Sequence, residues 1–107
     1  MAEYRVLWTD IAKADLYEIV TYIAADSVTS AVAVLDKIEN RAHTLERFPE
    51  RGRRVPELRA VDVLLYRELV EEPWRIVYRY DDKRVYVLAV LDARRDLEGV
   101  FLDRLSR

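Results

Sequence analysis

Cysteine is absent from this 107-residue chain, which excludes disulfides and catalysis by a thiol. The only histidine is His43, so a zinc or iron–sulfur site would lack its usual ligands. Glycine and proline are scarce, and no apolar run approaches the length of a membrane span. The first ten residues also lack the basic start and apolar centre of a signal peptide. We therefore predict an intracellular, cytoplasmic protein with no metal and no other cofactor.

Charge is abundant, mixed in sign and unevenly distributed along the chain. Charged residues make up 36% of the sequence, and the formal net charge is −2. Residues 1–50 carry five basic and nine acidic side chains, whereas residues 51–107 carry thirteen basic and eleven acidic ones. A protein that coats duplex nucleic acid needs a clear basic excess, which this chain lacks. Most of the basic residues are arginines, which favour bidentate contacts to carboxylate or phosphate, so an anionic partner must be bound locally.

Two amphipathic helices are predicted after a short first strand at Tyr4–Trp8. In both helices, apolar residues recur at alternating spacings of four and three. The stripe of the first helix, which starts at Thr9 or Asp10 and ends near Ala25, consists of Ala12, Leu16, Ile19 and Ile23. The stripe of the second, capped by Ser27 or Thr29, consists of Ala31, Leu35, Ile38, Ala42, Leu45 and Phe48. Two such stripes joined by a short link predict an antiparallel helical hairpin.

The second half of the chain predicts three consecutive strands, Tyr66–Val70, Trp74–Asp81 and Arg84–Leu91. These segments are rich in the branched and aromatic residues that suit a half-buried sheet surface. Because the breaks between them are short, we expect antiparallel hairpins. A short C-terminal helix follows, with Asp96 as its cap and Leu97, Val100, Phe101 and Leu105 on its apolar side.

The resulting order, β-α-α-β-β-β-α, predicts an α+β fold. We expect the helical hairpin to pack on one face of a small, mainly antiparallel sheet, above Trp74, Ile76 and Tyr78 of the middle strand. The aromatic residues of this strand are expected in the core, not as platforms on which bases stack. Since the chain has the size of one ordinary domain with one core, a single domain should span residues 1–107.

The other face of the predicted sheet carries arginines. Alternation along the middle strand places Arg75 and Arg79 on this face, away from the helices. If the first hairpin folds symmetrically about Glu71–Pro73, Arg67 lies opposite Val77 and joins them. Three guanidinium groups on a partly open face, with no acids at those strand positions, would repel one another without water or an anionic partner. A register slip of one residue would move Arg67 to the other face.

The segment 49–59, between the second helix and the three strands, is the most basic stretch of the chain. Its basic residues are Arg51, Arg53, Arg54 and Arg59. A charge run of this kind is usually a solvated linker. The alternative is an anion-binding lip beside the sheet, in which Arg53 and Arg54 take part.

Four motifs occur in this order: A-x-x-D-L-x-x-I-x-x-Y-I-A at Ala12–Ala24, F-P-E-R-G-R at Phe48–Arg53, W-R-I-V-Y-R at Trp74–Arg79 and V-L-A-V-L-D-A-R-R-D-L at Val87–Leu97. Together they resemble the RelE/ParE superfamily of toxins from bacterial type II toxin–antitoxin (plasmid stabilisation) systems, over nearly the whole chain. The resemblance implies a toxin that arrests growth until a cognate antitoxin neutralises it. The long helical hairpin, the P-E-x-G-R segment and the R-R-D-L segment look closer to the ParE-like branch.

The resemblance implies one of two activities. ParE-like members inhibit DNA gyrase and need only a surface that binds the target. The candidate residues for that surface are Arg53, Arg54, Arg67, Arg75, Arg79, Arg94 and Arg95. RelE-like members cleave mRNA on the ribosome, and there Arg67, Arg75 and Arg94 or Arg95 would stabilise the charge that develops on the phosphate. A third possibility is an inactive binding module that keeps the toxin fold.

Cleavage of RNA also requires a general base and a general acid, and the sequence offers few candidates. Arginine stays protonated, and His43 lies off the apolar stripe of its helix, as a surface residue would. Phe101 stands where RelE-like nucleases often have a tyrosine, and the lysines that some of them carry on the second strand are missing. The remaining carboxylates are Glu68, Asp92, Asp96 and Glu98. The sequence therefore favours gyrase inhibition over mRNA cleavage and leaves open whether the protein is an enzyme.

The resemblance also implies how an antitoxin binds. The arginine-bearing face and the groove of the predicted hairpin resemble the places where antitoxins of this family lay a helix and often add a strand to the sheet. We expect acidic antitoxin side chains to pair with Arg53, Arg54, Arg75 and Arg79. On this interpretation, replacing Arg75 and Arg94 together by alanine weakens toxicity and leaves folding intact.

Overall fold

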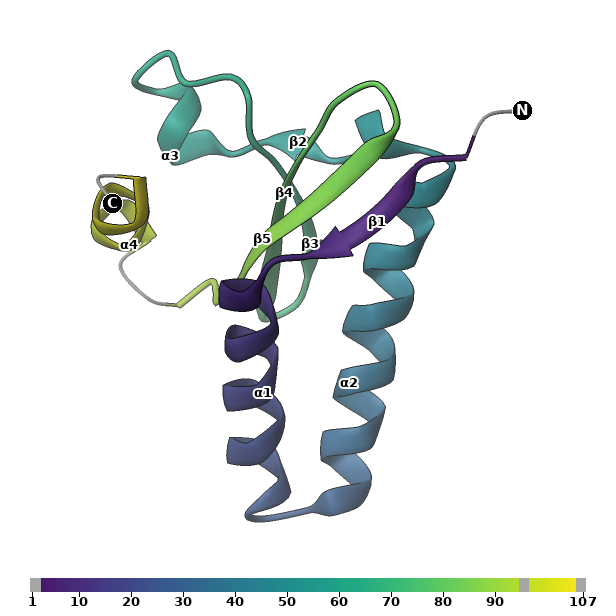
Figure 1. Cartoon of the computed structure of the whole chain (residues 1–107). Coiled ribbons are helices and arrows are strands. Elements are labelled where there is room, and N and C mark those ends of the chain that lie inside the picture. The colour runs from purple at the N-terminus through teal and green to yellow at the C-terminus, as the bar shows by residue number, and fades with distance from the viewer. Residues whose placement is uncertain (1–2, 95–96, 106–107) are drawn as a thin grey trace.

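Five strands form a single mixed sheet in the computed structural model, which describes residues 3–94 and 97–105 (Figure 1). Their order across the sheet is β1-β5-β4-β3-β2. The strands are β1 (Arg5–Trp8), β2 (Arg53–Arg54), β3 (Arg67–Glu71), β4 (Trp74–Tyr80) and β5 (Arg84–Asp92). Only β1 and β5 pair in parallel; the other neighbours are antiparallel. The predicted α+β class and mainly antiparallel sheet are confirmed, and β1 and β2 are the two edges.

The predicted helical hairpin is also confirmed. It consists of α1 (Asp10–Ala24) and α2 (Val28–His43), and it covers one face of the sheet and extends well beyond it (Figure 1). Each helix begins at a side-chain cap, because the hydroxyl of Thr9 accepts from the amide of Ala12 at 3.2 Å and that of Ser27 accepts from Ser30 at 3.1 Å. These two bonds satisfy amides that have no partner inside their own helix.

A first core fills the space between the hairpin and the sheet. Its buried residues are Ala12, Leu16, Ile38, Ala42, Leu45, Leu69, Ile76, Tyr78, Val85, Val87 and Val90. The Tyr78 hydroxyl donates to the carbonyl of Pro49 at 2.6 Å and accepts from the amide of Gly52 at 3.0 Å, so this aromatic residue is a core residue as predicted. Phe48 was expected to continue the stripe of the second helix, but it is 55% exposed because it follows a short 3-10 turn, η1 (Thr44–Glu46), that ends the helical path.

A second core covers the other face of the sheet, which the sequence predicted to be partly open. Two short helices, α3 (Pro56–Arg59) and α4 (Leu97–Leu105), lie over it (Figure 1). The buried residues are Val55, Leu58, Val77, Ala89, Leu91, Leu97 and Phe101. Arg104 of α4 also binds both carboxylate oxygens of Asp15 on α1 at 2.9 Å. The prediction of an open face is therefore wrong, and Asp96, the predicted cap of α4, lies outside the described residues.

The register of the first hairpin differs from the prediction by one residue. Glu71 pairs with Trp74, so the loop has two residues and not the three of Glu71–Pro73. Arg67 consequently pairs with Tyr78 rather than with Val77. Since paired residues share a face of the sheet, Arg67 lies on the face of Tyr78, opposite to Arg75.

The basic segment 49–59 is structured rather than a simple linker. It contains a 3-10 turn, η2 (Pro49–Arg51), then the edge strand β2, which pairs with β3, and then α3. Two-residue strands and one-turn helices carry no detectable periodicity, which explains why the sequence analysis placed a loop here. The segment positions Arg53, Arg54 and Arg59 along the β2 edge of the sheet.

Candidate interaction surfaces

Arg75 is the centre of a buried ion-pair network on the second face of the sheet. Its two terminal nitrogens donate to the carboxylate of Glu57 on α3 at 2.8 and 2.7 Å, and its Nε donates to Glu68 on β3 at 2.7 Å. The other oxygen of Glu68 accepts from Nε of Arg53 at 2.7 Å. The side chains of Arg75 and Glu68 are 7% and 0% exposed. We call these four residues the Arg75 network.

The network changes the ionisation of its members and removes Arg75 from solvent. Hydrogen bonds from Arg75 lower the pKa of Glu57, and the bonds to Glu57 and Glu68 raise the pKa of Arg75 further above its usual value. Glu57 and Arg75 therefore both stay charged at neutral pH. The expectation of arginines unmatched by acids is wrong, because Glu68 comes from the neighbouring strand and Glu57 from a helix whose presence was not predicted.

Of the other predicted arginines, Arg67, Arg79 and Arg94 do not join the Arg75 network. Arg67 lies on the opposite face and donates to the backbone carbonyls of Glu50 and Gly52 at 3.2 and 2.8 Å. Arg79 lies over the ring of Tyr86 at 4.3 Å from its centroid. Arg94 forms an exposed ion pair with Asp92 at 2.6 Å. Arg95 lies outside the described residues.

A surface pocket of about 730 Å³ gathers three arginines at the β2 edge of the sheet. Its lining consists of Arg53, Arg54, Pro56, Arg59, Ala60 and Leu64, and we call it the arginine pocket. Arg53 binds Glu68 through Nε only, and its side chain is 58% exposed. Arg54 donates to the carbonyl of Leu64. Arg59 is exposed, and its guanidinium makes no ion pair or hydrogen bond within the described part of the chain.

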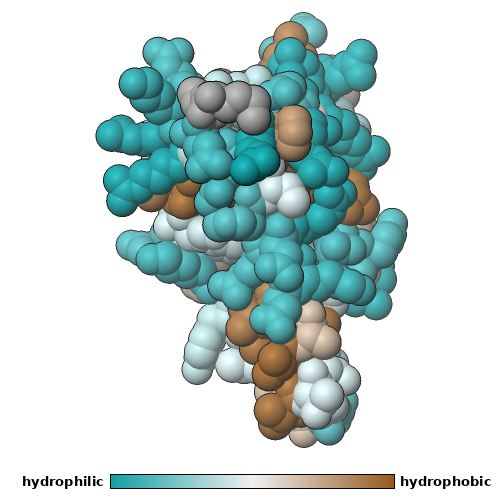
Figure 2. Space-filling view, turned by 90° about the vertical axis from the view of Figure 1, so that its right-hand side faces the viewer, coloured by the Kyte–Doolittle hydropathy of each residue, from teal (hydrophilic) through white to brown (hydrophobic). Residues whose placement is uncertain are grey.

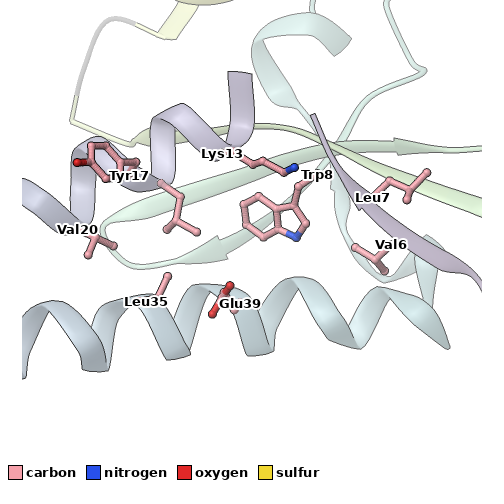
Figure 3. Close-up of a pocket in the computed structure, with 9 residues that line it drawn as sticks. Val6, Leu7, Trp8, Lys13, Tyr17, Val20, Leu35 and Glu39 are labelled. Carbon is pink, nitrogen blue, oxygen red and sulfur yellow. The ribbon is translucent and has the colours of Figure 1, made fainter. Parts of the chain in front are cut away.

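A second hollow, of about 510 Å³, lies between the hairpin and the opposite edge of the sheet (Figure 3). We call it the β1 groove; it is lined by Val6, Leu7, Trp8, Lys13, Leu16, Tyr17, Val20, Leu35 and Glu39. Figure 3 shows the indole of Trp8 between the two helices, with Lys13 of α1 on one side and Glu39 of α2 on the other. The groove thus has an apolar floor and an exposed charge of each sign at its rim.

The β1 groove borders an unpaired strand edge. The amides of Arg5 and Thr9 donate to Lys83 and Val87 at 2.9 and 3.1 Å, which directs them toward the interior of the sheet. Because amide direction alternates along a strand, the amides of Val6 and Trp8 point away from β5. An edge of this kind is a template for pairing with another chain.

Exposed apolar side chains continue from the groove toward the end of the hairpin. Figure 2 shows a mostly hydrophilic surface over the sheet and a brown area at the end of the hairpin. Tyr17, Tyr22 and Val28 are 70%, 82% and 69% exposed. Of these three residues, Tyr17 lines the groove, whereas Tyr22 and Val28 lie outside it.

Sequence reasoning missed the groove residues. Trp8, Lys13, Tyr17 and Glu39 were not candidates, because no local pattern reveals that a four-residue strand is an edge. The available signal was that Tyr17 and Lys13 lie off the buried stripe of α1 and Glu39 off that of α2.

The described residues offer no evident proton-transfer pair for a nuclease. Glu68 is enclosed by Arg53 and Arg75, and Asp92 binds Arg94. Glu98 is exposed in the first turn of α4, and Asp96 is not among the residues described. His43 is exposed, 3.2 Å from Glu46, in agreement with the prediction of a surface residue. No group of three or more potential metal ligands occurs in residues 3–94 and 97–105. None of the helices described is long and apolar enough to cross a membrane.

Comparison with known proteins gives consistent matches. A family model described as the ParE toxin of the type II toxin–antitoxin system parDE matches residues 6–97. Toxin ParE3 of Caulobacter vibrioides is 32% identical over 94 residues, which cover 87% of this chain and 90% of that protein.

Two solved structures share the fold. The chromosomal ParDE toxin–antitoxin system from P. aeruginosa contains a chain with a TM-score of 0.68 at 22% identity, covering 84% of this chain and 96% of that one. The toxin–antitoxin complex RelBE2 from Mycobacterium tuberculosis contains a chain with a TM-score of 0.59 at 24% identity, covering 86% of this chain and 93% of that one.

Proposed function

Because the chain belongs to the ParE toxin family of type II toxin–antitoxin systems, we propose that it arrests growth in the cytoplasm by inhibiting DNA gyrase and that a cognate antitoxin neutralises it. Gyrase inhibition is the activity that the resemblance implies for ParE-like members. It requires a surface that binds the target, and it requires no proton-transfer pair.

The state of Arg75 is the observation that carries this choice. In an mRNA nuclease of the superfamily, the corresponding arginine would have to contact the scissile phosphate. Here all three nitrogens of Arg75 already donate to carboxylates, and the side chain is 7% exposed. A phosphate would have to displace Glu57 and approach Glu68, which is an anion with 0% exposure. Displacing carboxylates from a buried arginine is costly, so the network favours a binding protein over a nuclease.

The β1 groove is the surface on which we place the antitoxin. Its apolar floor suits the apolar side of an amphipathic helix, and the free edge of β1 suits an added strand. The two solved structures named above come from toxin–antitoxin systems, which supports an antitoxin as the partner. Lys13 and Glu39 at the rim would then require an acid and a base at matching positions of the antitoxin.

Supercoiling of relaxed plasmid by purified gyrase tests the proposed target. Titration of the toxin should abolish supercoiling and trap cleaved DNA, and the antitoxin should reverse both effects. If gyrase remains fully active with excess folded toxin that still arrests growth, the proposal fails. Ribosome-dependent mRNA cleavage should then be measured as the runner-up. A folded protein that arrests no growth without antitoxin would be the inactive binding module.

A matched pair of tyrosines tests the antitoxin site. Tyr17 lines the β1 groove, whereas Tyr22 is on the same helix and outside it, and both are highly exposed. We expect Tyr17→Asp to weaken antitoxin binding by about 30-fold, the loss typical of an aromatic residue at the centre of an interface. Tyr22→Asp should change the affinity by less than about threefold. Equal effects of the two variants in a binding titration would contradict the assignment of the groove.

A further inference from the structure

The arginine pocket has positive charge that the protein does not neutralise. Two acids beside the pocket, Glu57 and Glu68, are engaged in the Arg75 network, and the Asp62 carboxylate makes no bond to the pocket arginines within the described residues. Arg53 shares Glu68 with Arg75, and Arg54 donates to a neutral carbonyl. Arg59 makes no side-chain bond within the described residues. Arg54 and Arg59 are therefore available to an anionic group, which guanidinium binds in a planar, bidentate manner.

An apolar patch adjoins these arginines. Val61, Leu64 and Leu65 are 65%, 47% and 57% exposed, and Leu64 also lines the pocket. Three neighbouring aliphatic side chains exposed in one loop beside arginines have the composition of the centre of a protein interface with a charged rim.

The loop that carries this patch is held in one conformation. The carbonyl of Leu64 accepts from Arg54, the amide of Val63 donates to Leu58 at 2.9 Å, and the amide of Asp62 donates to Arg59 at 3.0 Å. Asp62 has a φ of 63°, a left-handed conformation that is uncommon outside glycine. Such strained positions concentrate where a structure presents a functional surface, and a fixed loop loses little entropy on binding.

We propose that the arginine pocket and the patch of Val61, Leu64 and Leu65 form the surface that docks the target of the toxin, through an acidic protein segment with an apolar side chain. The acid binds Arg54 and Arg59, and the apolar side chain packs on the leucines. A protein fits this surface better than a single-stranded nucleic acid, because the pocket lining and the patch contain no aromatic residue on which a base would stack. The inference rests on the proposed function, since it assumes that the toxin acts by binding a protein.

This surface lies at the β2 edge, whereas the β1 groove lies at the other edge of the five-stranded sheet. Target docking and antitoxin docking therefore depend on different side chains. A variant of the arginine pocket should lose activity on the target and keep its affinity for the antitoxin, which a general loss of folding would not produce.

The test uses a double variant, Arg59→Glu with Leu65→Ser, and Lys37→Glu as the control. Arg59 and Leu65 are exposed, so neither change removes a core contact. Lys37 is exposed on α2, and its replacement makes the same change of charge as the replacement of Arg59. Gyrase supercoiling, growth arrest on induced expression, antitoxin affinity and the thermal midpoint are measured for each protein.

We expect the double variant to need at least about 30-fold more toxin for half-inhibition of supercoiling, as for the loss of a central interface residue. It should also fail to arrest growth, with an unchanged thermal midpoint and antitoxin affinity, while Lys37→Glu behaves as wild type. Inhibition by the double variant at wild-type concentrations would overturn the inference.

Two further outcomes separate this inference from the proposed target. If the wild type arrests growth without inhibiting gyrase, the gyrase proposal fails. Growth arrest by the double variant is then the measurement that decides the inference. If the double variant still arrests growth, the inference is overturned, and if it no longer does, the inference is supported. A fluorescent 20-nucleotide DNA, single-stranded or duplex, is the second probe. If the wild type binds it at physiological salt and the double variant does not, a nucleic acid occupies the pocket and the protein segment is overturned.

Discussion

Replacing Arg75 by alanine should destabilise the protein strongly, although the sequence predicted a functional and not a structural role. The change removes three hydrogen bonds to Glu57 and Glu68. Glu57 is 28% exposed and gains water in exchange. Glu68, whose side chain is 0% exposed, keeps only its hydrogen bond from Arg53. Its buried negative charge therefore loses the neighbouring positive charge of Arg75.

The size of the effect follows from the burial of Glu68. Removing one partner of a buried ion pair typically costs about 3–5 kcal/mol of folding free energy. A domain of this size has a free energy of unfolding of about 5–15 kcal/mol. The variant should therefore stay folded at 25 °C unless the wild type lies at the low end of this range. Since 1 kcal/mol shifts the midpoint of a small domain by about 4–8 °C, the melting temperature should fall by at least about 12 °C.

Urea unfolding at pH 7, followed by the fluorescence of Trp8 and Trp74, measures this loss. Arg94→Ala is the control, because Arg94 forms an ion pair in which its own side chain is 76% exposed, so its loss should leave the urea midpoint nearly unchanged. The double change Arg75→Met with Glu68→Leu should recover stability to within about 2 kcal/mol of the wild type, because no buried charge is left unpaired. A loss below about 1 kcal/mol for Arg75→Ala would refute the reasoning. The prediction that Arg75→Ala and Arg94→Ala together leave folding intact is therefore withdrawn.

Two further predictions concern the same region. The pKa of Glu57 lies below 4.5 because Arg75 donates to it, so the pair stabilises the fold above about pH 4.5 and loses this contribution as the pH falls through the lowered pKa. As the pH is lowered below about 4.5, the difference in urea midpoint between wild type and Glu57→Gln should therefore shrink, and a difference that stays constant would contradict this prediction. A Cβ at Gly52 would lie 2.5 Å from the Tyr78 hydroxyl and 2.6 Å from the Glu68 carbonyl, so Gly52→Ala should cost about 1–3 kcal/mol in urea unfolding. The exposed helical Gly99→Ala should be neutral or stabilising, and a similar loss there would argue against a steric cause.

The elements with many periodic residues could be predicted from the sequence. The stripes that include Ala12, Leu16, Ile38 and Ala42 identify the hairpin, and Leu45 is buried as expected. The three strands of the meander were placed to within one residue at either end, because branched and aromatic residues fill them between short turns. These signals are local, and local signals also determine the order of the elements and the fold class.

The surroundings of Arg75 could not be predicted, because they depend on non-local geometry. A hairpin loop of two residues instead of three moves Arg67 away from Arg75 and brings Glu68 to the same face. Glu57 reaches Arg75 from α3, a single turn of helix that begins at Pro56 and has no periodicity of its own. Residues that the sequence assigns separately to a basic loop and an arginine-bearing strand thus form one network with a buried centre, Glu68 and Arg75.

The ion pairs of the Arg75 network change which arginines are available to a partner. The charges of Arg53 and Arg75 are balanced by those of Glu57 and Glu68, so the Arg75 network offers a partner no net charge. Arg54 and Arg59 have no carboxylate partner among the described residues, and both line the pocket at the β2 edge. An arginine in W-R-I-V-Y-R therefore indicates a phosphate-binding site only if no acid from β3 or α3 reaches it. In this chain two acids reach it, and the surface left for an acidic partner is at the edge of the sheet.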